Sequence, residues 1–77
     1  MVFDKVREVI SSQLGIPEDK IEMTTSFTDD LGADSLDIFQ VISELEEIFD
    51  LEFSNEDAEK IKLIADAVRY IEERIEA

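Results

Sequence analysis

A serine at the predicted start of an acidic helix is the residue best placed to do chemistry in this chain. The segment Gly32-Ala33-Asp34-Ser35-Leu36-Asp37 puts Ser35 in the first helical turn, just after a glycine that allows a sharp turn. Unpartnered backbone N–H groups and the helix dipole favour a phosphate at such a position. We expect the hydroxyl to be exposed, and no strong base stands nearby, so its modification would require a separate enzyme. These residues alone also allow a simpler interpretation, in which Asp34 caps a helix and Ser35 is its first residue.

Composition excludes most catalytic sites. The 77 residues contain no Cys and no His, which removes disulfides, thiolate zinc sites and the usual general base. Two glycines are too few for a glycine-rich phosphate loop. The acidic residues 29–34 lack the alternating acids of a calcium loop, and their glycine falls at the wrong place. A chain this short also offers no deep cleft to raise the pKa of one of two paired carboxylates. We therefore expect no catalytic residues and no metal site.

Acidic residues dominate the chain and are unevenly spread. The sequence has 21 Asp and Glu against 7 Lys and Arg, for a net charge of −14. Residues 21–59 hold 13 of the acids and none of the bases. A negative surface argues against nucleic acid and anionic lipid as partners and favours basic proteins. The alternative is that these acids only solvate one face of the domain.

The chain shows no sign of a membrane or export segment. No apolar run approaches the ~20 residues of a membrane-spanning helix, so we expect no membrane insertion. The start, Met1-Val2-Phe3-Asp4, lacks the basic and apolar regions of a signal peptide. We therefore expect a cytoplasmic protein. We also expect it to be a monomer.

Hydrophobic spacing predicts one all-α domain over residues 1–77, a small four-helix bundle with three longer helices and one short one. The first helix ends before Gly15, and its apolar stripe comprises Phe3, Val6, Val9, Ile10 and Leu14. A long ordered loop follows over residues 16–34, held to the core by Ile16, Ile21, Phe27 and Leu31. The next helix covers residues 35–50, with Asp34 and Asp37 forming a capping box and with a stripe of Ile38, Val41, Ile42, Leu45, Ile48 and Phe49.

The rest of the chain predicts a short helix and a final longer one. Residues 49–53 alternate like a strand, but a lone strand would lack a partner, so we expect a loop there. Ser54 is expected to cap a short helix that ends at Lys60. The last helix is defined by Ile64, Ala67, Val68, Ile71 and Ile75.

The segment around Ser35 resembles the prosthetic-group segment of the acyl carrier proteins of dissociated (type II) fatty acid synthesis. Asp-Ser-Leu alone is a weak match, because short motifs match by chance. The likeness spans essentially the whole chain, however, and its spacing makes it strong enough to favour attachment over a simple helix start. The matching blocks are Gln13-Leu14-Gly15, Ser26-Phe27, Asp30-Leu31-Gly32, Leu45-Glu46-Glu47, Phe49-Asp50, Ala58-Glu59-Lys60-Ile61, and Ala67, Tyr70 and Ile71.

The resemblance implies a non-catalytic carrier of acyl groups. It implies that Ser35 bears phosphopantetheine through a phosphodiester, attached from coenzyme A by a phosphopantetheinyl transferase. The terminal thiol of this arm would hold growing acyl chains as thioesters, which explains how a chain without Cys can do thiol chemistry.

The resemblance also implies two sets of binding residues. One set would contact basic patches on the transferase, the fatty acid synthase enzymes and acyltransferases: Asp34, Leu36, Asp37, Glu46 and Glu47. The family shelters the acyl chain between its helices, and the candidates for that lining are Phe27, Ile38, Leu45, Ala58, Ile61 and Ala67. Ordinary core packing is the alternative role for each residue of the second set.

Four residues at three sites depart from the family pattern. Gln40 stands where an acid is common, Ser43 where an exposed Met is frequent, and Ser54-Asn55 replaces a common Pro-Asp. Two further functions therefore stay open. One is a dedicated carrier for polyketide, lipid A or another specialised acyl transfer. The more remote one is an unmodified acidic helical adaptor for basic proteins.

Overall fold

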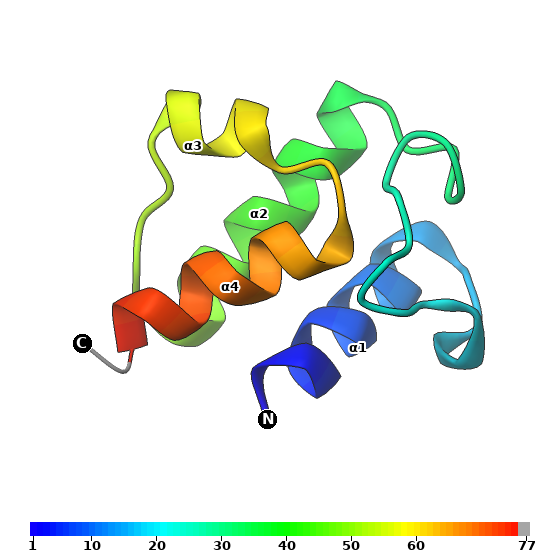
Figure 1. The fold of residues 1–77 in the computed structure, drawn as a ribbon, viewed down its shortest axis with the longest axis horizontal. Helices are drawn as coiled ribbons and strands as arrows, with labels where there is room; N and C mark the ends of the chain where they lie inside the picture. The colour runs from blue at the N-terminus through cyan, green and yellow to red at the C-terminus, as the bar shows by residue number, and fades with distance from the viewer. Residues whose placement is uncertain (76–77) are drawn as a thin grey trace.

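Four segments with apolar residues at helical spacing form the helices of a computed structural model, which describes residues 1–75 (Figure 1). The α-helices are α1 (Val2–Leu14), α2 (Ser35–Phe49), α3 (Asn55–Lys60) and α4 (Ile64–Ile75). The loop after α1 contains a single 3-10 turn, η1 (Glu18–Lys20), which was not predicted from the sequence. Over residues 1–75 the only β pairing is an isolated antiparallel bridge between Ser26 and Leu63. The all-α prediction of three longer helices and one short helix is confirmed.

Helix α1 packs against both α2 and α4, and the core lies where these three helices meet. The bulkiest side chains that lose nearly all contact with water are Phe27, Ile10, Ile21, Leu45, Ile64 and Ile71. Burying each of them contributes about 1.5–3 kcal/mol relative to leaving it in water. Two of the six come from the long loop, so the predicted role of Ile21 and Phe27 as loop anchors is confirmed.

Ile48 was predicted to lie in the core-facing apolar stripe of α2, and this prediction is wrong. Ile48 is 41% exposed, whereas Val41, Ile42 and Leu45 are buried. At about 100° per residue, Phe49 lies closer than Ile48 to the centre of the buried face. Phe49 and Leu51 therefore close the core at this end of α2.

The ends of the helices follow local sequence signals. Gly15 adopts the left-handed conformation with φ 69°, which ends α1 as predicted. Asp34 Oδ1 accepts from the Asp37 backbone N–H at 2.9 Å, and Asp37 Oδ2 accepts from the Asp34 N–H at 3.2 Å, which confirms the capping box. Helix α2 ends at Phe49, one residue before the predicted end, because Asp50 is in the left-handed conformation with φ 53°. Ser54 caps α3 as predicted.

Backbone hydrogen bonds fasten the long loop to the start of α4. The Phe27 N–H donates to the Lys62 carbonyl at 3.0 Å, and the Ile64 N–H donates to the Thr25 carbonyl at 2.9 Å. Figure 1 shows the loop folded over one end of the bundle, next to the point where the chain enters α2. The loop therefore holds the Gly32 turn, with φ 66°, in a fixed place before Ser35.

A polar and aromatic cluster attaches the short helix α3 to α4. Asp57 Oδ2 accepts a hydrogen bond from the Ser54 hydroxyl at 2.8 Å and lies 4.0 Å from the Arg74 guanidinium. The Tyr70 hydroxyl lies 3.0 Å from both Asp57 Oδ2 and the Glu52 carbonyl oxygen, which share its single proton. The Phe53 and Tyr70 rings stack with centroids 4.1 Å apart, and the Arg74 guanidinium lies 4.0 Å from the Tyr70 centroid. These contacts join the segment before α3 to the last turns of α4.

The α3–α4 attachment should depend on pH. The hydrogen bond from Ser54, and then that from Tyr70, hold the pKa of Asp57 below the ordinary value of 3.8, with Arg74 and Lys60 adding to the effect. A pKa lowered by folding stabilises the fold above the unfolded pKa and loses that effect as pH falls through the folded value. We expect Asp57→Asn to lower the free energy of unfolding at pH 7, and the difference from wild type to shrink as the pH falls below 3.8 and through the lowered pKa of Asp57.

Urea unfolding of both proteins across pH 2.5–7 measures this difference, with Glu56→Gln as a matched control. Glu56 is an exposed acid one residue away on α3, so its replacement removes the same charge without removing the attachment. An equal loss of stability in the two variants would show that Asp57 acts only through its charge.

Candidate functional site

Ser35 occupies the first turn of α2, and its side chain is exposed. The capping box uses the carboxylates of Asp34 and Asp37, which leaves the serine hydroxyl without a hydrogen bond to any group in residues 1–75. The positive end of the helix dipole and the N–H groups of the first turn favour a negatively charged substituent there. The exposed position and free hydroxyl therefore fit a phosphodiester at Ser35.

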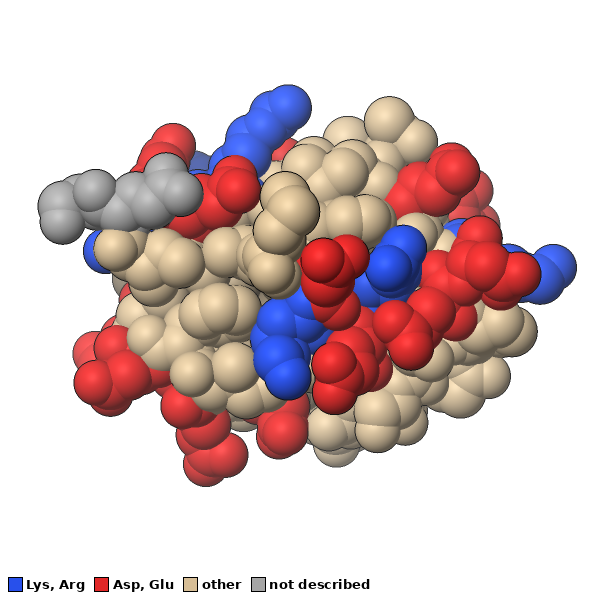
Figure 2. Space-filling view, turned by 90° about the horizontal axis from the view of Figure 1, so that it is seen from below, with Lys and Arg blue, Asp and Glu red and all other residues tan. Residues whose placement is uncertain are grey.

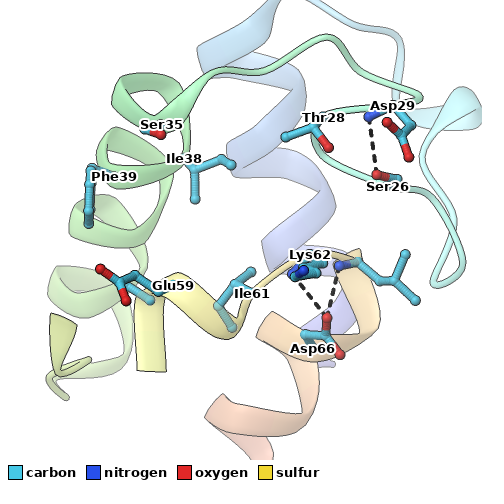
Figure 3. A pocket seen from close by; sticks show the side chains of 12 residues that line it. Ser26, Thr28, Asp29, Ser35, Ile38, Phe39, Glu59, Ile61, Lys62 and Asp66 are labelled. Atoms are coloured by element: carbon cyan, nitrogen blue, oxygen red, sulfur yellow. Dashed lines mark hydrogen bonds between the residues drawn. The ribbon is translucent and has the colours of Figure 1, made fainter. Parts of the chain in front are cut away.

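Ser35 also lies on the rim of a cavity of about 760 Å³ (Figure 3). In Figure 3, Ile38 and Phe39 of α2 and Ile61 after α3 lie on one side of this cavity. Thr28 and Asp29 of the loop, together with Lys62 and Asp66, lie on the other side. The lining consists of Ser26, Thr28, Asp29, Ser35, Ile38, Phe39, Ala58, Glu59, Ile61, Lys62, Leu63 and Asp66. A group attached to Ser35 could therefore reach both kinds of lining. Its hydrocarbon parts would contact the apolar side chains of the cavity, and its amide groups would contact the polar ones.

The six candidates for an acyl lining fall into two groups. Ile38, Ala58 and Ile61 line the cavity beside Ser35. Phe27, Leu45 and Ala67 are at most 1% exposed and lie inside the core, away from the cavity wall. Of the six candidates, an acyl chain in this cavity would therefore touch only Ile38, Ala58 and Ile61.

The residues predicted to meet partners lie along α2, but they do not all present free side chains. Leu36 is 65% exposed, and Asp34 and Glu47 are also exposed. Asp37 is half-buried by its capping role, and Glu46 Oε2 accepts a hydrogen bond from the Phe53 N–H at 2.8 Å. A shallow hollow on the outer side of α2 brings together Leu36 and Glu47 with Gln13, Phe39, Gln40, Ser43 and Glu44.

Phe39 was not predicted from the sequence as a site residue, but it lines both the cavity beside Ser35 and the outer hollow. It lies off the apolar stripe, so the pattern gave it no core position. The available signal was its spacing, because a residue four positions after Ser35 lies on the same side of the helix. Lys62 was missed as well, although it is the only Lys or Arg that lines the cavity in the described part of the chain.

Positive charge is concentrated away from α2. On α1, Lys5 pairs with Glu8 at 3.5 Å, and Arg7 pairs with Asp4 at 3.3 Å and with Glu18 at 3.6 Å. Figure 2, which views the molecule from below Figure 1, shows Lys and Arg side chains surrounded by Asp and Glu on that face. By contrast, the acids of α2 form no ion pair within residues 1–75. Their charge is therefore uncompensated and attracts basic surfaces.

Comparison with known proteins identifies the class to which this site belongs. Residues 4–71 match the family described as the phosphopantetheine attachment site, so the chain contains the domain that bears this cofactor. The chain is 53% identical over 76 residues to the acyl carrier protein of Clostridium acetobutylicum, with 99% of both proteins covered. It is 48% identical over 73 residues to that of Bdellovibrio bacteriovorus, with 95% of this chain and 94% of the relative covered.

The solved structures agree with these sequence matches. A putative acyl carrier protein from Mycobacterium tuberculosis superimposes with a TM-score of 0.85 at 32% identity, and all of both chains is covered. The chain therefore belongs to the acyl carrier protein family, whose members are in general carriers rather than catalysts. Across the described residues, no helix has the length and apolar character needed to cross a bilayer.

Proposed function

We propose that Ser35 is the attachment residue for phosphopantetheine and that the loaded protein carries acyl thioesters between enzymes of fatty acid synthesis. The observation that carries this proposal is the exposed hydroxyl of Ser35, which forms no hydrogen bond within residues 1–75 and sits in the first turn of α2 beside a cavity. The family match supports phosphopantetheine as the cofactor. The position of the hydroxyl supports Ser35 as the residue to which it is attached.

The residues of this chain would bind and present the acyl group without making or breaking bonds. When bound, the prosthetic group supplies a thiol on a flexible arm. The first turn of α2 favours the negative charge of the phosphodiester at Ser35. Ile38, Ala58 and Ile61 would shelter an apolar chain, since each methylene exposed to water costs about 0.8 kcal/mol. Docking of a partner on α2 would raise the effective concentration of the acyl group near the partner's active site.

The proposal is tested by incubating the protein with coenzyme A and a phosphopantetheinyl transferase and measuring its intact mass. We expect a single increment equal to one phosphopantetheine. An unchanged mass under conditions that load another carrier would contradict the proposal and would favour an unmodified acidic adaptor.

Partner docking should depend on the acidic outer side of α2. We expect Glu47→Lys to slow association with the transferase by about threefold to tenfold at low ionic strength, because it reverses one exposed charge in a steering field. The difference should shrink as salt is added, since about 0.15 M salt screens exposed charges beyond roughly 8 Å. Stopped-flow association rates at several ionic strengths measure both the slowing and its dependence on salt.

The matched control for docking is Glu73→Lys. It changes the net charge by the same amount at an exposed site on α4, outside the outer hollow. Equal slowing by both variants would mean that total charge, and not the α2 surface, steers the partner.

A specialised pathway is a second candidate, favoured by the composition of the outer hollow. Gln40 and Ser43 are both exposed there, so the hollow lacks one acid and one apolar contact that family members commonly have. Complementation of a strain that lacks its housekeeping carrier separates the two functions. Growth supports the general role, and failure despite full loading at Ser35 supports the dedicated one.

A further inference from the structure

The ring of Phe39 separates two hollows on α2. It lines the cavity that holds Ser35, Ile38 and Ile61, and it also lines the outer hollow that holds Leu36. The side chain is 46% exposed, although a residue this apolar is normally driven into the core. Its ring is thus part of the wall between the cavity and the outer surface, with apolar area still available for contact.

Helix geometry places this ring next to the attachment point. Residues four apart on an α-helix are neighbours, with Cβ atoms about 5–6 Å apart. Figure 3 shows Phe39 one turn along α2 from Ser35, on the side of the cavity where Glu59 of α3 lies. An arm that leaves Ser35 and folds back into the cavity therefore has this ring within reach on the cavity wall.

We propose that Phe39 is a cargo-contacting residue that determines how strongly the protein shelters apolar acyl groups. The ring covers the outer side of a chain whose inner side rests on Ile38, Ala58 and Ile61. This contact stabilises the sheltered position of a long apolar acyl group but not that of an acetyl group. Phe39 therefore makes the protein shelter long acyl chains more strongly than short ones. The inference rests on the proposed attachment at Ser35.

The contact also links cargo to docking. Leu36 lies in the outer hollow only, whereas Phe39 belongs to both hollows. A partner that covers the outer hollow therefore touches the same ring that covers the acyl chain.

The test compares protection of the thioester from hydroxylamine, with acetyl and octanoyl groups loaded on the whole protein. Each rate is divided by the rate for the same acyl group on free phosphopantetheine, which removes intrinsic reactivity. Full burial of one methylene shifts the equilibrium between exposed and sheltered acyl chain about fourfold. The octanoyl group has more methylenes than the acetyl group, so even partial burial should protect the octanoyl thioester about tenfold more in wild type. We expect this ratio to fall below about twofold in Phe39→Ala. It should stay near wild type in the matched control Ile48→Ala, because Ile48 is an exposed apolar residue of α2 that lines neither hollow.

Several outcomes would overturn the inference. They are a wild-type ratio near one, an unchanged ratio in Phe39→Ala, or an equal fall in Ile48→Ala. If Phe39→Ala does not fold, Phe39→Leu provides the same comparison. Its ratio should then lie between the wild-type value and the value of about twofold expected for Phe39→Ala. An unchanged ratio in Phe39→Leu would contradict the proposal. Failure of wild type to accept the prosthetic group is a different result, seen by intact mass, and it would overturn the proposed function along with this inference.

Discussion

Replacing Ser35 by alanine is expected to abolish loading of phosphopantetheine and to leave the fold intact. The change removes the only atom through which the phosphodiester can form at this position. The side chain is exposed and forms no hydrogen bond within residues 1–75, so the free energy of unfolding should change by no more than about 0.5 kcal/mol. Intact mass after incubation with coenzyme A and the transferase measures loading, and thermal unfolding checks the fold.

Ser43→Ala is the matched control for this prediction. Ser43 is an exposed serine on the same helix, two turns further along and in the outer hollow. We expect this variant to load like wild type. Loading of Ser35→Ala, or loss of loading in Ser43→Ala instead, would place the attachment elsewhere and would refute the proposed function.

Truncation of Leu45 to alanine is expected to destabilise the domain by about 2–5 kcal/mol, because it removes buried methylene groups and leaves a cavity. Leu45 is completely buried in the middle of α2. A domain of this size is stable by only about 4–12 kcal/mol. The uncompensated acids of α2 lower that figure further, since like charges repel in the compact state. We therefore expect a substantial unfolded population near 37 °C, measured by urea unfolding and circular dichroism.

Leu36→Ala makes the same chemical change on the same helix at a residue that is 65% exposed. Its effect on the free energy of unfolding should be within about 0.5 kcal/mol. Added salt should raise the stability of both variants, because it screens repulsion among the acids. A loss in Leu45→Ala no larger than that in Leu36→Ala would mean that α2 is not held by its buried face.

Local chemistry made the helices and the proposed attachment serine predictable. The capping box at Asp34 and Asp37, the left-handed Gly15 and the cap at Ser54 each depend on residues within four positions of one another. The same local spacing predicted Ser35 as an exposed residue of the first helical turn, and the structure places it there. The end of α2 differed by one residue, because Asp50 adopts the left-handed conformation that terminates the helix.

The sequence by itself therefore determined the order of the helices, their caps, the uncompensated acids and the position of Ser35, since neighbouring residues specify all of these. Tertiary structure decided which apolar residues line the cavity and which only fill the core. Ile38 and Leu45 belong to one predicted stripe, yet the first lines the cavity and the second is sealed inside. It also placed Phe39 between two hollows and brought Asp57 to Tyr70. The physical reason is that these contacts depend on how each helix is rotated and where it crosses its neighbours, which residues far apart in the chain determine together.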